Sequence, residues 1–497
     1  MVTSLSLPPF NYLIINFLIF TFFFIFLIKK SSNSKNKKFF FLYGWLFGLG
    51  YFISNLYWIS ISLTFDQSFK FLIPLTIFLI PAFLAIFYGL ISYFFILFKP
   101  KKIISSFLFF SLIFGVFEFV RGTILTGFPW NLIAYSFSNY LEILSITSVI
   151  GTYGFNLFCI SLFTSPAIFF LREDKKDIGV FIIFLITPII FYIYGSFYEE
   201  KFNTAHKITY DYKVRAISSN ISIDRFYSNI DSISVIEDLI KISNPNETEK
   251  TIFVWPEGIL PDILQQELIE YSWLFKKSFN KNHILVIGIN SESKNNGSKN
   301  YFNSFSIYDN ELNLLNFYNK INLVPFGEFL PLENFLNKIG MKKITPGYSS
   351  FSNGRGESTL EFNFNGNSLK LLPLICYEII FPNLIEDNTN KYNFIVNISE
   401  DAWFGESIGP YQHFAKAILR SIESRKFVIR SANKGKSVFV DPNGKVIKSL
   451  EPIEAGNIEL ELPLLESTKK QYKKSLIFYS LLITYVLTFF VLRKFKI

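Results

Sequence analysis

Seven apolar stretches, each long enough to cross a lipid bilayer as a helix, constrain what this chain can fold into. Six precede residue 200 and the seventh lies near residue 480; we place them at Phe10–Ile28, Phe39–Leu63, Phe71–Phe98, Ile103–Val120, Ile143–Leu171, Ile178–Tyr194 and Ser475–Leu492. Half of the 497 residues are hydrophobic and only 18% are charged, which is too apolar for a soluble protein of this size. The sequence therefore predicts a multi-pass membrane protein.

One long stretch of mixed polarity separates the sixth apolar stretch from the seventh. Short apolar strands there alternate with helical periods and with turns rich in Gly, Asn and Asp. The length of the stretch suits one α/β domain with a core of its own. We therefore predict a transmembrane helical domain over residues 1–200, a soluble domain over 203–467 and a C-terminal transmembrane helix over 475–492.

The basic residues predict how the helices are oriented. They cluster after the first, third, fifth and seventh apolar stretches, at Lys29–Lys38, Lys99–Lys102, Arg172–Lys176 and Arg493–Lys496. The positive-inside rule places these four clusters in the cytoplasm and the soluble domain on the opposite side. Four lysines at the outer end of the last helix disagree, and we expect them to meet anionic headgroups or acidic residues of the domain: Lys469, Lys470, Lys473 and Lys474.

Several classes of function are disfavoured. The net charge of +9 does not predict nucleic-acid binding, because the basic residues concentrate beside the membrane. The sequence has no glycine-rich phosphate loop, and the spacing of His206, His283 and His413 is not that of metal ligands, so no cofactor or metal is expected. We expect His413 to be a buried structural residue. Cys159 and Cys376 are the only cysteines, and no disulfide framework is expected.

Three reactive side chains stand near the ends of predicted strands in the soluble domain. Glu257 follows a strand that ends at Pro256, Lys320 stands in an apolar stretch, and Cys376 ends a strand that begins at Leu371. Taken singly, each has an ordinary explanation as a cap, a solvated edge residue or an inert core thiol. Open α/β sheets, however, place reactive groups at strand ends, and a carboxylate, an amine and a thiol are the parts needed for acyl transfer through a thioester.

Together these segments resemble the nitrilase superfamily, in which a Glu, a Lys and a Cys each end a strand. Motifs in both halves of the chain resemble, more specifically, the apolipoprotein N-acyltransferases, the membrane-bound branch of this carbon-nitrogen hydrolase superfamily: Gly127–Trp130, Gly151–Gly154, Leu323–Glu328, Cys376–Ile380, Asp401–Gly405, Ser407–His413 and Arg430–Asn433. The resemblance implies a multi-pass transmembrane helical bundle plus a nitrilase-like αββα sandwich as an extracytoplasmic domain.

The resemblance also implies a ping-pong reaction. Glu257 is expected to be the general base, Cys376 the nucleophile, and Lys320 the group that stabilises the oxyanion and helps to lower the pKa of the thiol. Cys376 takes an acyl chain from a phospholipid, expected to be phosphatidylethanolamine, as a thioester. The α-amine of the N-terminal diacylglyceryl-cysteine of an apolipoprotein then receives it. We expect a monomer in the bacterial inner membrane, with its catalytic domain on the periplasmic side.

Four further residues are expected to support the site. By resemblance, Glu328 and Glu378 position the lysine and the thiol, although each alone could pair with a nearby basic residue. Tyr377 is expected to border the acyl pocket and Trp403 to belong to a mobile lid, with a place in the core as the alternative for both. The apolar loop tips at residues 128–130 and 326–330 are candidates for a wall and a lid at the bilayer surface.

The sequence departs from the family pattern in places. It has seven predicted spans where eight are typical. Glu400 stands where an asparagine usually precedes the Asp-Ala-Trp-Phe-Gly run, and Lys434 where a small or polar residue is usual. Ser219–Ser222 replaces a glutamine-bearing motif, and Arg225 and Phe226 replace a lysine–tryptophan pair. These departures concern substrate contacts more than the three catalytic positions.

Two alternatives stay open. A membrane-tethered amidase acting on a small amide would share the three reactive residues, but it would need neither the Pro-Phe-Gly-Glu segment nor so many spans. A catalytically inactive lipid-binding or transport protein would need ionisable groups inside the membrane, for which Glu118 and Arg121 are the candidates.

Overall fold

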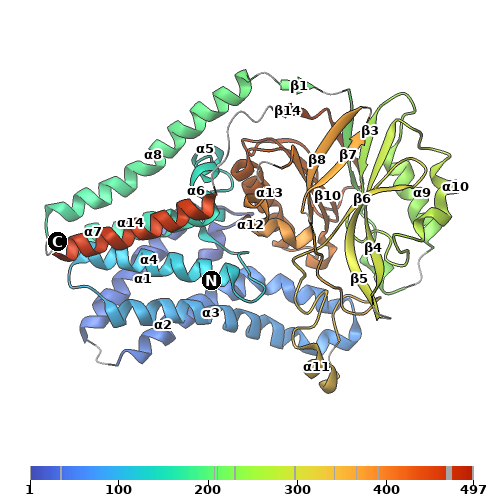
Figure 1. Cartoon of the computed structure of the whole chain (residues 1–497). Coiled ribbons are helices and arrows are strands. Elements are labelled where there is room, and N and C mark those ends of the chain that lie inside the picture. Colours follow the sequence, from blue (N-terminus) through green and yellow to red (C-terminus); the bar gives the residue numbers. More distant parts are fainter. Residues whose placement is uncertain are drawn as a thin grey trace. The chain divides into compact units, whose positions relative to one another are not determined.

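The computed structural model divides the chain into two compact units, which we describe separately (Figure 1). The first unit contains Met1–Ser60, Phe71–Thr204 and Tyr472–Ile497, and the second contains Ile61–Lys70 and Ala205–Gln471. The structure describes residues 2–33, 36–205, 207–209, 211–228, 231–295, 298–340, 342–356, 358–364, 366–388, 391–465 and 473–494. Residues considered above that lie outside this description are Lys35, His206, Lys469, Lys470 and Lys496.

The first unit is helical. Within the described part of the chain, seven helices are long and apolar enough to cross a membrane, which confirms the seven predicted stretches. Most ends differ by at most four residues, but the sixth helix continues to Thr204, ten residues beyond its predicted end at Tyr194. They are α1 (Leu13–Asn33), α2 (Lys38–Leu56) with η2 (Tyr57–Thr64), η3 (Gln67–Leu72) with α3 (Ile73–Phe98), α4 (Ile103–Thr123), α6 (Thr147–Thr164) with α7 (Pro166–Leu171), α8 (Lys175–Thr204) and α14 (Lys474–Lys494). The short helix η1 (Val2–Ser6) precedes α1, and η4 (Ile133–Phe137) and α5 (Leu141–Leu144) lie between α4 and α6.

Helices α2 and α3 pack closely because α2 has small residues where the two meet. Gly44 and Gly48 lie about one turn apart, and a Cβ at Gly44 would stand 2.2 Å from the Tyr88 carbonyl oxygen of α3. Small residues four positions apart allow membrane helices to approach in this way. The two glycines therefore determine how near these backbones lie.

Glu118 and Arg121, both buried on α4, bind each other. Arg121 Nη2 donates to Glu118 Oε2 over 2.7 Å and Arg121 Nε donates to Oε1 over 3.2 Å. Arg121 Nη1 also donates to the Phe128 carbonyl oxygen, so the pair joins α4 to the loop at residues 127–131. An ionisable residue inside a membrane is otherwise a candidate for a transport pathway. Here the two charges compensate each other within one helix.

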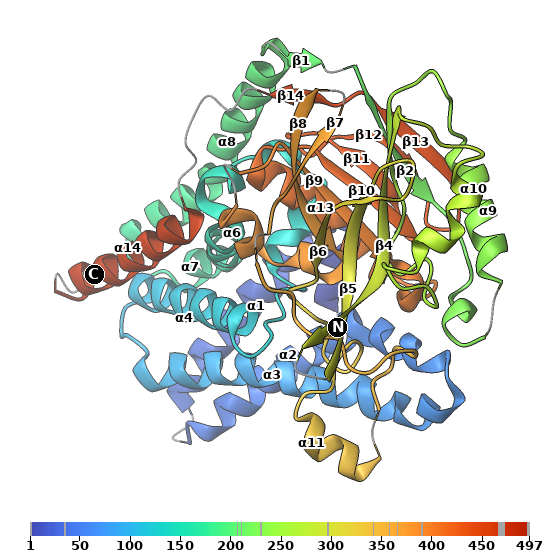
Figure 2. The ribbon, with the colours of Figure 1, turned by 45° about the vertical axis from the view of Figure 1, so that its right-hand side comes forward.

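The second unit is a sandwich of two six-stranded sheets that lie face to face (Figure 2). One sheet has the order β13-β2-β3-β4-β5-β6 and the other β12-β11-β10-β9-β8-β7. The first comprises β13 (Gly456–Leu460), β2 (Lys213–Ser218), β3 (Thr251–Val254), β4 (His283–Asn295), β5 (Ser298–Tyr308) and β6 (Leu314–Asn319). The second comprises β12 (Val446–Leu450), β11 (Ser437–Val440), β10 (Val428–Asn433), β9 (Phe394–Glu400), β8 (Asn367–Ile375) and β7 (Leu360–Phe364). A short sheet pairs β1 (Lys207–Thr209) with β14 (Pro463–Leu465).

Helices cover the outer faces of the sandwich. Helix α9 (Ser232–Ser243) packs on β2 and β13, whereas α13 (Gly409–Ser424) packs on β10 and β11, and β2 meets β10 between the sheets. The remaining helical segments are η5 (Ile223–Phe226), η6 (Leu268–Tyr271), α10 (Ser272–Phe275), α11 (Glu333–Leu336), η7 (Asn337–Ile339), η8 (Cys376–Ile380), α12 (Pro382–Glu386) and η9 (Asp401–Phe404). These layers confirm the predicted αββα fold; the side of the membrane on which it lies stays a prediction.

The central strands are parallel and buried from both sides. Strands β2, β3 and β4 run parallel, as do β8, β9 and β10. All seven residues of β9 are buried, because neighbouring strands flank it and the other layers cover it. Its first three residues are apolar, whereas its carboxyl end has the polar residues Asn397, Ser399 and Glu400. This change of polarity along one strand marks the end of the sheet at which the site lies.

Candidate active site

The structure brings Glu257, Lys320 and Cys376 together just beyond the ends of β3, β6 and β8. Lys320 Nζ lies 3.2 Å from Glu257 Oε1 and 3.0 Å from Glu328 Oε1. The charges of Glu257 and Lys320 both act on the Cys376 thiol. All four side chains are buried, so their electrostatic interactions are stronger than they would be in water.

Three donors fix the Glu257 carboxylate. Oε1 accepts from Asn303 Nδ2 over 2.7 Å and from Lys320 Nζ, while Oε2 accepts from the Glu400 backbone N–H over 2.9 Å. Gly288 on β4 makes room for this strand end, because a Cβ there would lie 2.5 Å from the Glu257 Cα. The carboxylate therefore has a fixed position and a neighbouring cation.

Lys320 is a permanent cation between two carboxylates. Burial alone disfavours the charged amine, but Glu257 and Glu328 together raise the pKa of Lys320 above its usual value. The amine therefore keeps its proton over the physiological range. A fixed buried cation is suited to stabilise a developing oxyanion and poorly suited to exchange protons.

Cys376 occupies a sharp turn between β8 and η8. Its backbone has a φ of 49°, in the left-handed region that few residues other than glycine adopt. Burial, and next the Glu257 carboxylate, raise the pKa of the thiol well above its usual value, while Lys320 lowers it. Lys320 thus acts in the predicted direction, but burial outweighs it. The resting group is a thiol that needs a base before it can attack.

Glu378 joins the segment after Lys320 to the strand that ends at Cys376. The carboxylate accepts four hydrogen bonds: to Oε1 from Tyr318 Oη (2.7 Å), Ile321 N (2.8 Å) and Asn322 N (3.0 Å), and to Oε2 from Ile375 N (2.9 Å). Burial raises its pKa, yet four donors and no acceptor among these partners favour the ionised form. The contacts are those expected of a residue that positions both the lysine and the thiol.

Glu328 and Asn303 complete the surroundings of Lys320. Glu328 Oε1 accepts from Lys320 Nζ and from Asn303 Nδ2, and its Oε2 accepts from the Val324 N–H over 2.8 Å. The sequence did not single out Asn303, whose amide donates to both Glu257 and Glu328. The signal that could have revealed it is a polar residue at a buried position of a strand.

Tyr377 and Trp403 lie among aromatic side chains. Tyr377 is buried and packs edge-on against Phe381, with ring centres 5.0 Å apart. Trp403, on η9, lies in a cluster of three other rings, Phe226 at 5.3 Å, Phe65 at 6.0 Å and Tyr227 at 6.4 Å. The pocket and lid roles of the two residues remain predictions.

His413 is buried, as expected, but it also reaches the backbone of the nucleophile. Its Nε2 lies 3.1 Å from the Cys376 carbonyl oxygen and its Nδ1 lies 3.0 Å from Asp401 Oδ1. Arg430 Nη2 donates to Asp401 Oδ2 over 2.6 Å. Burial and then Arg430 lower the pKa of His413, which favours its neutral form. The sequence interpretation left out this support beneath the Cys376 turn.

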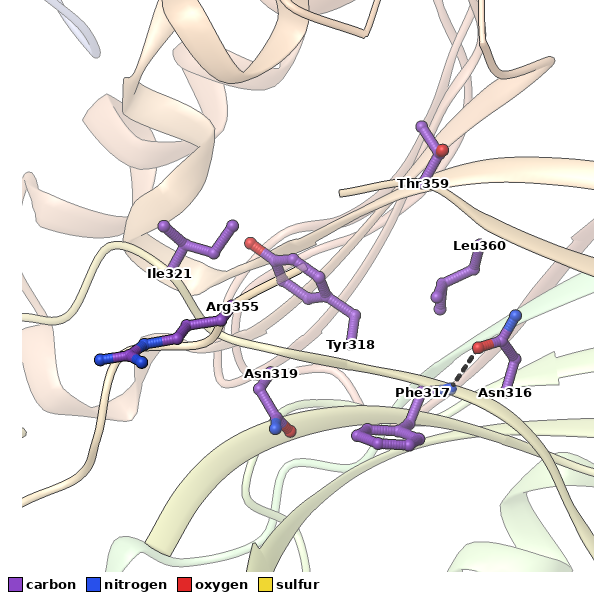
Figure 3. A pocket seen from close by; sticks show the side chains of 8 residues that line it. All are labelled: Asn316, Phe317, Tyr318, Asn319, Ile321, Arg355, Thr359 and Leu360. Carbon is purple, nitrogen blue, oxygen red and sulfur yellow. Dashed lines mark hydrogen bonds between the residues drawn. The ribbon is translucent and has the colours of Figure 1, made fainter. Parts of the chain in front are cut away.

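A cavity of about 220 Å³ lies beside β6 (Figure 3). Its lining residues are Asn316, Phe317, Tyr318, Asn319, Ile321, Arg355, Thr359 and Leu360. Tyr318 lines it while donating its hydroxyl to Glu378. Because Glu257, Lys320 and Cys376 do not line this cavity, it is not where they would react. Within the described part of the chain, no group of three or more His, Cys, Asp or Glu side chains could hold a metal ion.

Comparisons with known proteins cover both units. Residues 1–164 match the family model for the apolipoprotein N-acyltransferase N-terminal domain, and residues 246–469 match the carbon-nitrogen hydrolase model. A protein named apolipoprotein N-acyltransferase from Rickettsia prowazekii is 32% identical over 432 residues, which cover 85% of this chain and 83% of that protein. One of the same name from Rhodopseudomonas palustris is 31% identical over 434 residues, covering 84% of this chain and 80% of that protein.

A solved structure covers a smaller part of the chain. Nit3 of Saccharomyces cerevisiae, a member of the nitrilase superfamily, has 18% sequence identity and a TM-score of 0.36. The match covers 53% of this chain and 93% of Nit3.

Proposed function

This chain belongs to the apolipoprotein N-acyltransferase family, and from that membership we propose that it transfers a fatty acyl chain from a phospholipid to the α-amine of a diacylated lipoprotein through a thioester on Cys376. The observation that carries the proposal is the buried group formed by Glu257, Lys320 and Cys376, in a chain whose described residues include seven apolar helices long enough to cross a membrane. A protonated thiol needs an adjacent base, and Glu257 is the carboxylate whose charge acts on it most strongly.

In the first half-reaction, Glu257 takes the proton of the Cys376 thiol as the sulfur attacks the ester carbonyl of the phospholipid. Lys320 stabilises the oxyanion of the tetrahedral intermediate. When the intermediate collapses, the carbon–oxygen bond breaks and a carbon–sulfur bond remains. The leaving alkoxide takes the proton from Glu257 and departs as a lysophospholipid, and Glu257 is again a carboxylate.

In the second half-reaction, the neutral α-amine of the lipoprotein attacks the thioester. Glu257 accepts the proton that the nitrogen loses, and Lys320 again faces the oxyanion. The carbon–sulfur bond breaks, the amide forms, and the proton returns from Glu257 to the sulfur. Both halves use one base and one cation, so one fixed site serves both.

We propose phosphatidylethanolamine as the donor, lipoproteins with an N-terminal diacylglyceryl-cysteine as acceptors, and a monomer as the active form. Both substrates lie in a bilayer, and the apolar helices would keep the enzyme there. In the predicted loop tip at residues 326–330, Phe326 is exposed and Leu330 is buried. Leu332 and Phe335, which follow this tip, are exposed too, and these three apolar side chains support the proposal of a contact with the bilayer surface. The positive-inside asymmetry supports an inner-membrane location with the catalytic unit in the periplasm.

Intact-mass spectrometry of the purified full-length protein tests the chemistry. After incubation with phosphatidylethanolamine in detergent micelles, we expect one acyl adduct, which hydroxylamine and a diacylated N-terminal cysteine peptide both remove. Cys376→Ala should form no adduct, whereas the matched variant Cys159→Ala should form it normally. Survival of the adduct in Cys376→Ala would refute the mechanism. Ammonia release from a small amide without any lipid adduct would favour the amidase alternative.

Thiol labelling tests the orientation separately. In a background without native cysteines, we introduce Ser228→Cys in the second unit or Asp174→Cys between α7 and α8. A membrane-impermeant maleimide added to intact spheroplasts should label the first variant only. Labelling of Asp174→Cys alone would reverse the proposed orientation.

A further inference from the structure

We propose that Arg225 and Glu400 form a buried ion pair that positions the base Glu257 for acyl transfer. Both are positioning residues, because they contact Glu257 and its neighbour Gly258 and would act through the base. The inference rests on the proposed function, which assigns Glu257 its role. It concerns two positions at which the sequence departs from its family pattern and which the sequence alone treats as unrelated.

The two side chains meet inside the sandwich although they lie 175 residues apart in the chain. Arg225 belongs to η5 and Glu400 ends β9. Arg225 Nη2 donates to Glu400 Oε2, and the two side chains are 1% and 2% exposed. A buried ion pair loses much more when one partner is removed than when both are replaced. The pair therefore behaves as one unit.

Glu400 links the base to the segment that bears Trp403. Its backbone N–H donates to Glu257 Oε2 over 2.9 Å. Its side-chain Oε1 accepts from the Ala402 N–H over 3.1 Å and so caps η9. Asn433 Nδ2 donates to the same carboxylate over 2.9 Å. A shift of the Glu400 side chain would therefore move a donor of the base and the start of η9 together.

Arg225 contacts the backbone beside the base. Its Nη2 lies 3.4 Å from the carbonyl oxygen of Gly258, the residue after Glu257, and its Nη1 donates to the Ser222 carbonyl oxygen over 3.0 Å. The guanidinium carbon lies 4.6 Å from the ring centre of Phe226, one of the rings packed on Trp403. Arg225 thus contacts the backbone just after Glu257 directly and reaches Glu257 itself through Glu400.

The charges of the pair affect Glu257 in opposite senses. The ionisable groups around the base are Lys320 after β6, Glu328 in the next loop, Cys376 after β8, Arg225 on η5 and Glu400 on β9. Burial lowers the pKa of Arg225 to about 9, and Glu257 raises it. By reciprocity, the Arg225 cation favours the ionised base. Loss of this cation disfavours the carboxylate form, and loss of the Glu400 anion favours it.

The test measures the rate of thioester formation against pH in four full-length variants: R225M, E400Q, the double variant and R225K. We expect each neutralising single change to slow the reaction at pH 7 by about 100-fold, the cost of a small misplacement of a catalytic group. The acid limb of the profile should move to higher pH in R225M and to lower pH in E400Q. The double variant should react at least tenfold faster than either single variant, because no unpaired charge remains. R225K retains the charge and should leave the acid limb in place.

The exposed ion pair of Glu361 and Lys370 supplies the matched control, and E361Q with K370M should behave as wild type. If one single variant fails to fold, the limb shift of the other single variant and its rate relative to the double variant still decide the question. The proposal is overturned if folded single variants keep the wild-type rate, if both limbs move in the same direction, or if the double variant is as slow as the singles. Absence of a thioester in the wild-type protein would instead overturn the proposed function.

Discussion

Replacing Glu378 by glutamine should loosen two segments of the site at once. The side chain keeps its size, but one oxygen becomes an NH2 group. If the amide oxygen retains the donors that now bond Oε1, the NH2 group faces the Ile375 N–H, and two donors oppose each other. The three remaining hydrogen bonds also lose the strength that the charge gives them.

The expected size follows from these bonds. An unpaired buried donor costs about 1–3 kcal/mol, and each hydrogen bond to a charged group is worth about 1 kcal/mol more than one to a neutral group. Relief from burying a carboxylate offsets part of the loss. We expect a net loss of about 3 kcal/mol, which is roughly a 100-fold increase in local opening.

Hydrogen exchange measured by mass spectrometry checks this prediction. In E378Q, peptides that contain Ile321 and Asn322 and peptides that contain Ile375 should both exchange about 100-fold faster. Thioester formation should slow as well, because Lys320 and Cys376 lose their common support. The control is E361Q on neighbouring β7, where the exposed carboxylate is worth at most about 1 kcal/mol. Faster exchange in only one of the two segments would refute the reasoning that Glu378 joins them.

Other consequences of the site geometry are open to measurement. In K320M, the loss of the cation between two carboxylates should slow thioester formation about 100- to 1000-fold, while K299M, at an exposed lysine of β5, should match wild type by the same mass assay. Alkylation of Cys376 by iodoacetamide should be slow at pH 7 and still rise above pH 9, because the pKa of the thiol is raised; a plateau below pH 8 would contradict this. In D401N, the buried Arg430 loses its partner, and the thermal midpoint at pH 7 should fall by the equivalent of about 3–5 kcal/mol. Burial alone would raise the pKa of Asp401, but Arg430 and His413 together lower it below its usual value of 3.8. The stabilisation by the Asp401 carboxylate is therefore present above pH 4 and is lost as the pH falls further. Melting curves of D401N and wild type should converge only in strong acid.

The parts that the sequence predicted are those encoded by local patterns. Long apolar stretches predict membrane helices directly, and short strands that alternate with helical segments predict an α/β domain. Glu257 and Cys376 were predictable because each follows an apolar strand, and parallel strands direct their carboxyl ends to one edge. Predicting that Lys320 belongs to the site required the family resemblance. The strand before it, β6, is a largely exposed edge strand, so its hydrophobic pattern is weak.

The remaining features depend on contacts between distant segments. Asn303 is an ordinary asparagine in sequence, and it matters only because β5 places it between two carboxylates. Glu400 and Arg225 looked like two separate departures from the family, yet they compensate each other in space. The direction in which the pKa of the Cys376 thiol shifts depends on how deeply the folded domain buries it. The residues next to Cys376 in the sequence do not show that burial.

The short segment Ile61–Lys70 has a consequence for how the protein matures. It lies between α2 and α3 and includes parts of η2 and η3, but it belongs to the compact unit formed by Ala205–Gln471, and its Phe65 packs on Trp403. During synthesis this segment leaves the ribosome long before Trp403 has been made, so it cannot yet pack against the unit to which it belongs. Its docking can occur only once η9 has been made. A disulfide between cysteines placed at positions 65 and 403 should therefore form only after the second unit has been synthesised and folded. Chains truncated before position 403 should not form it.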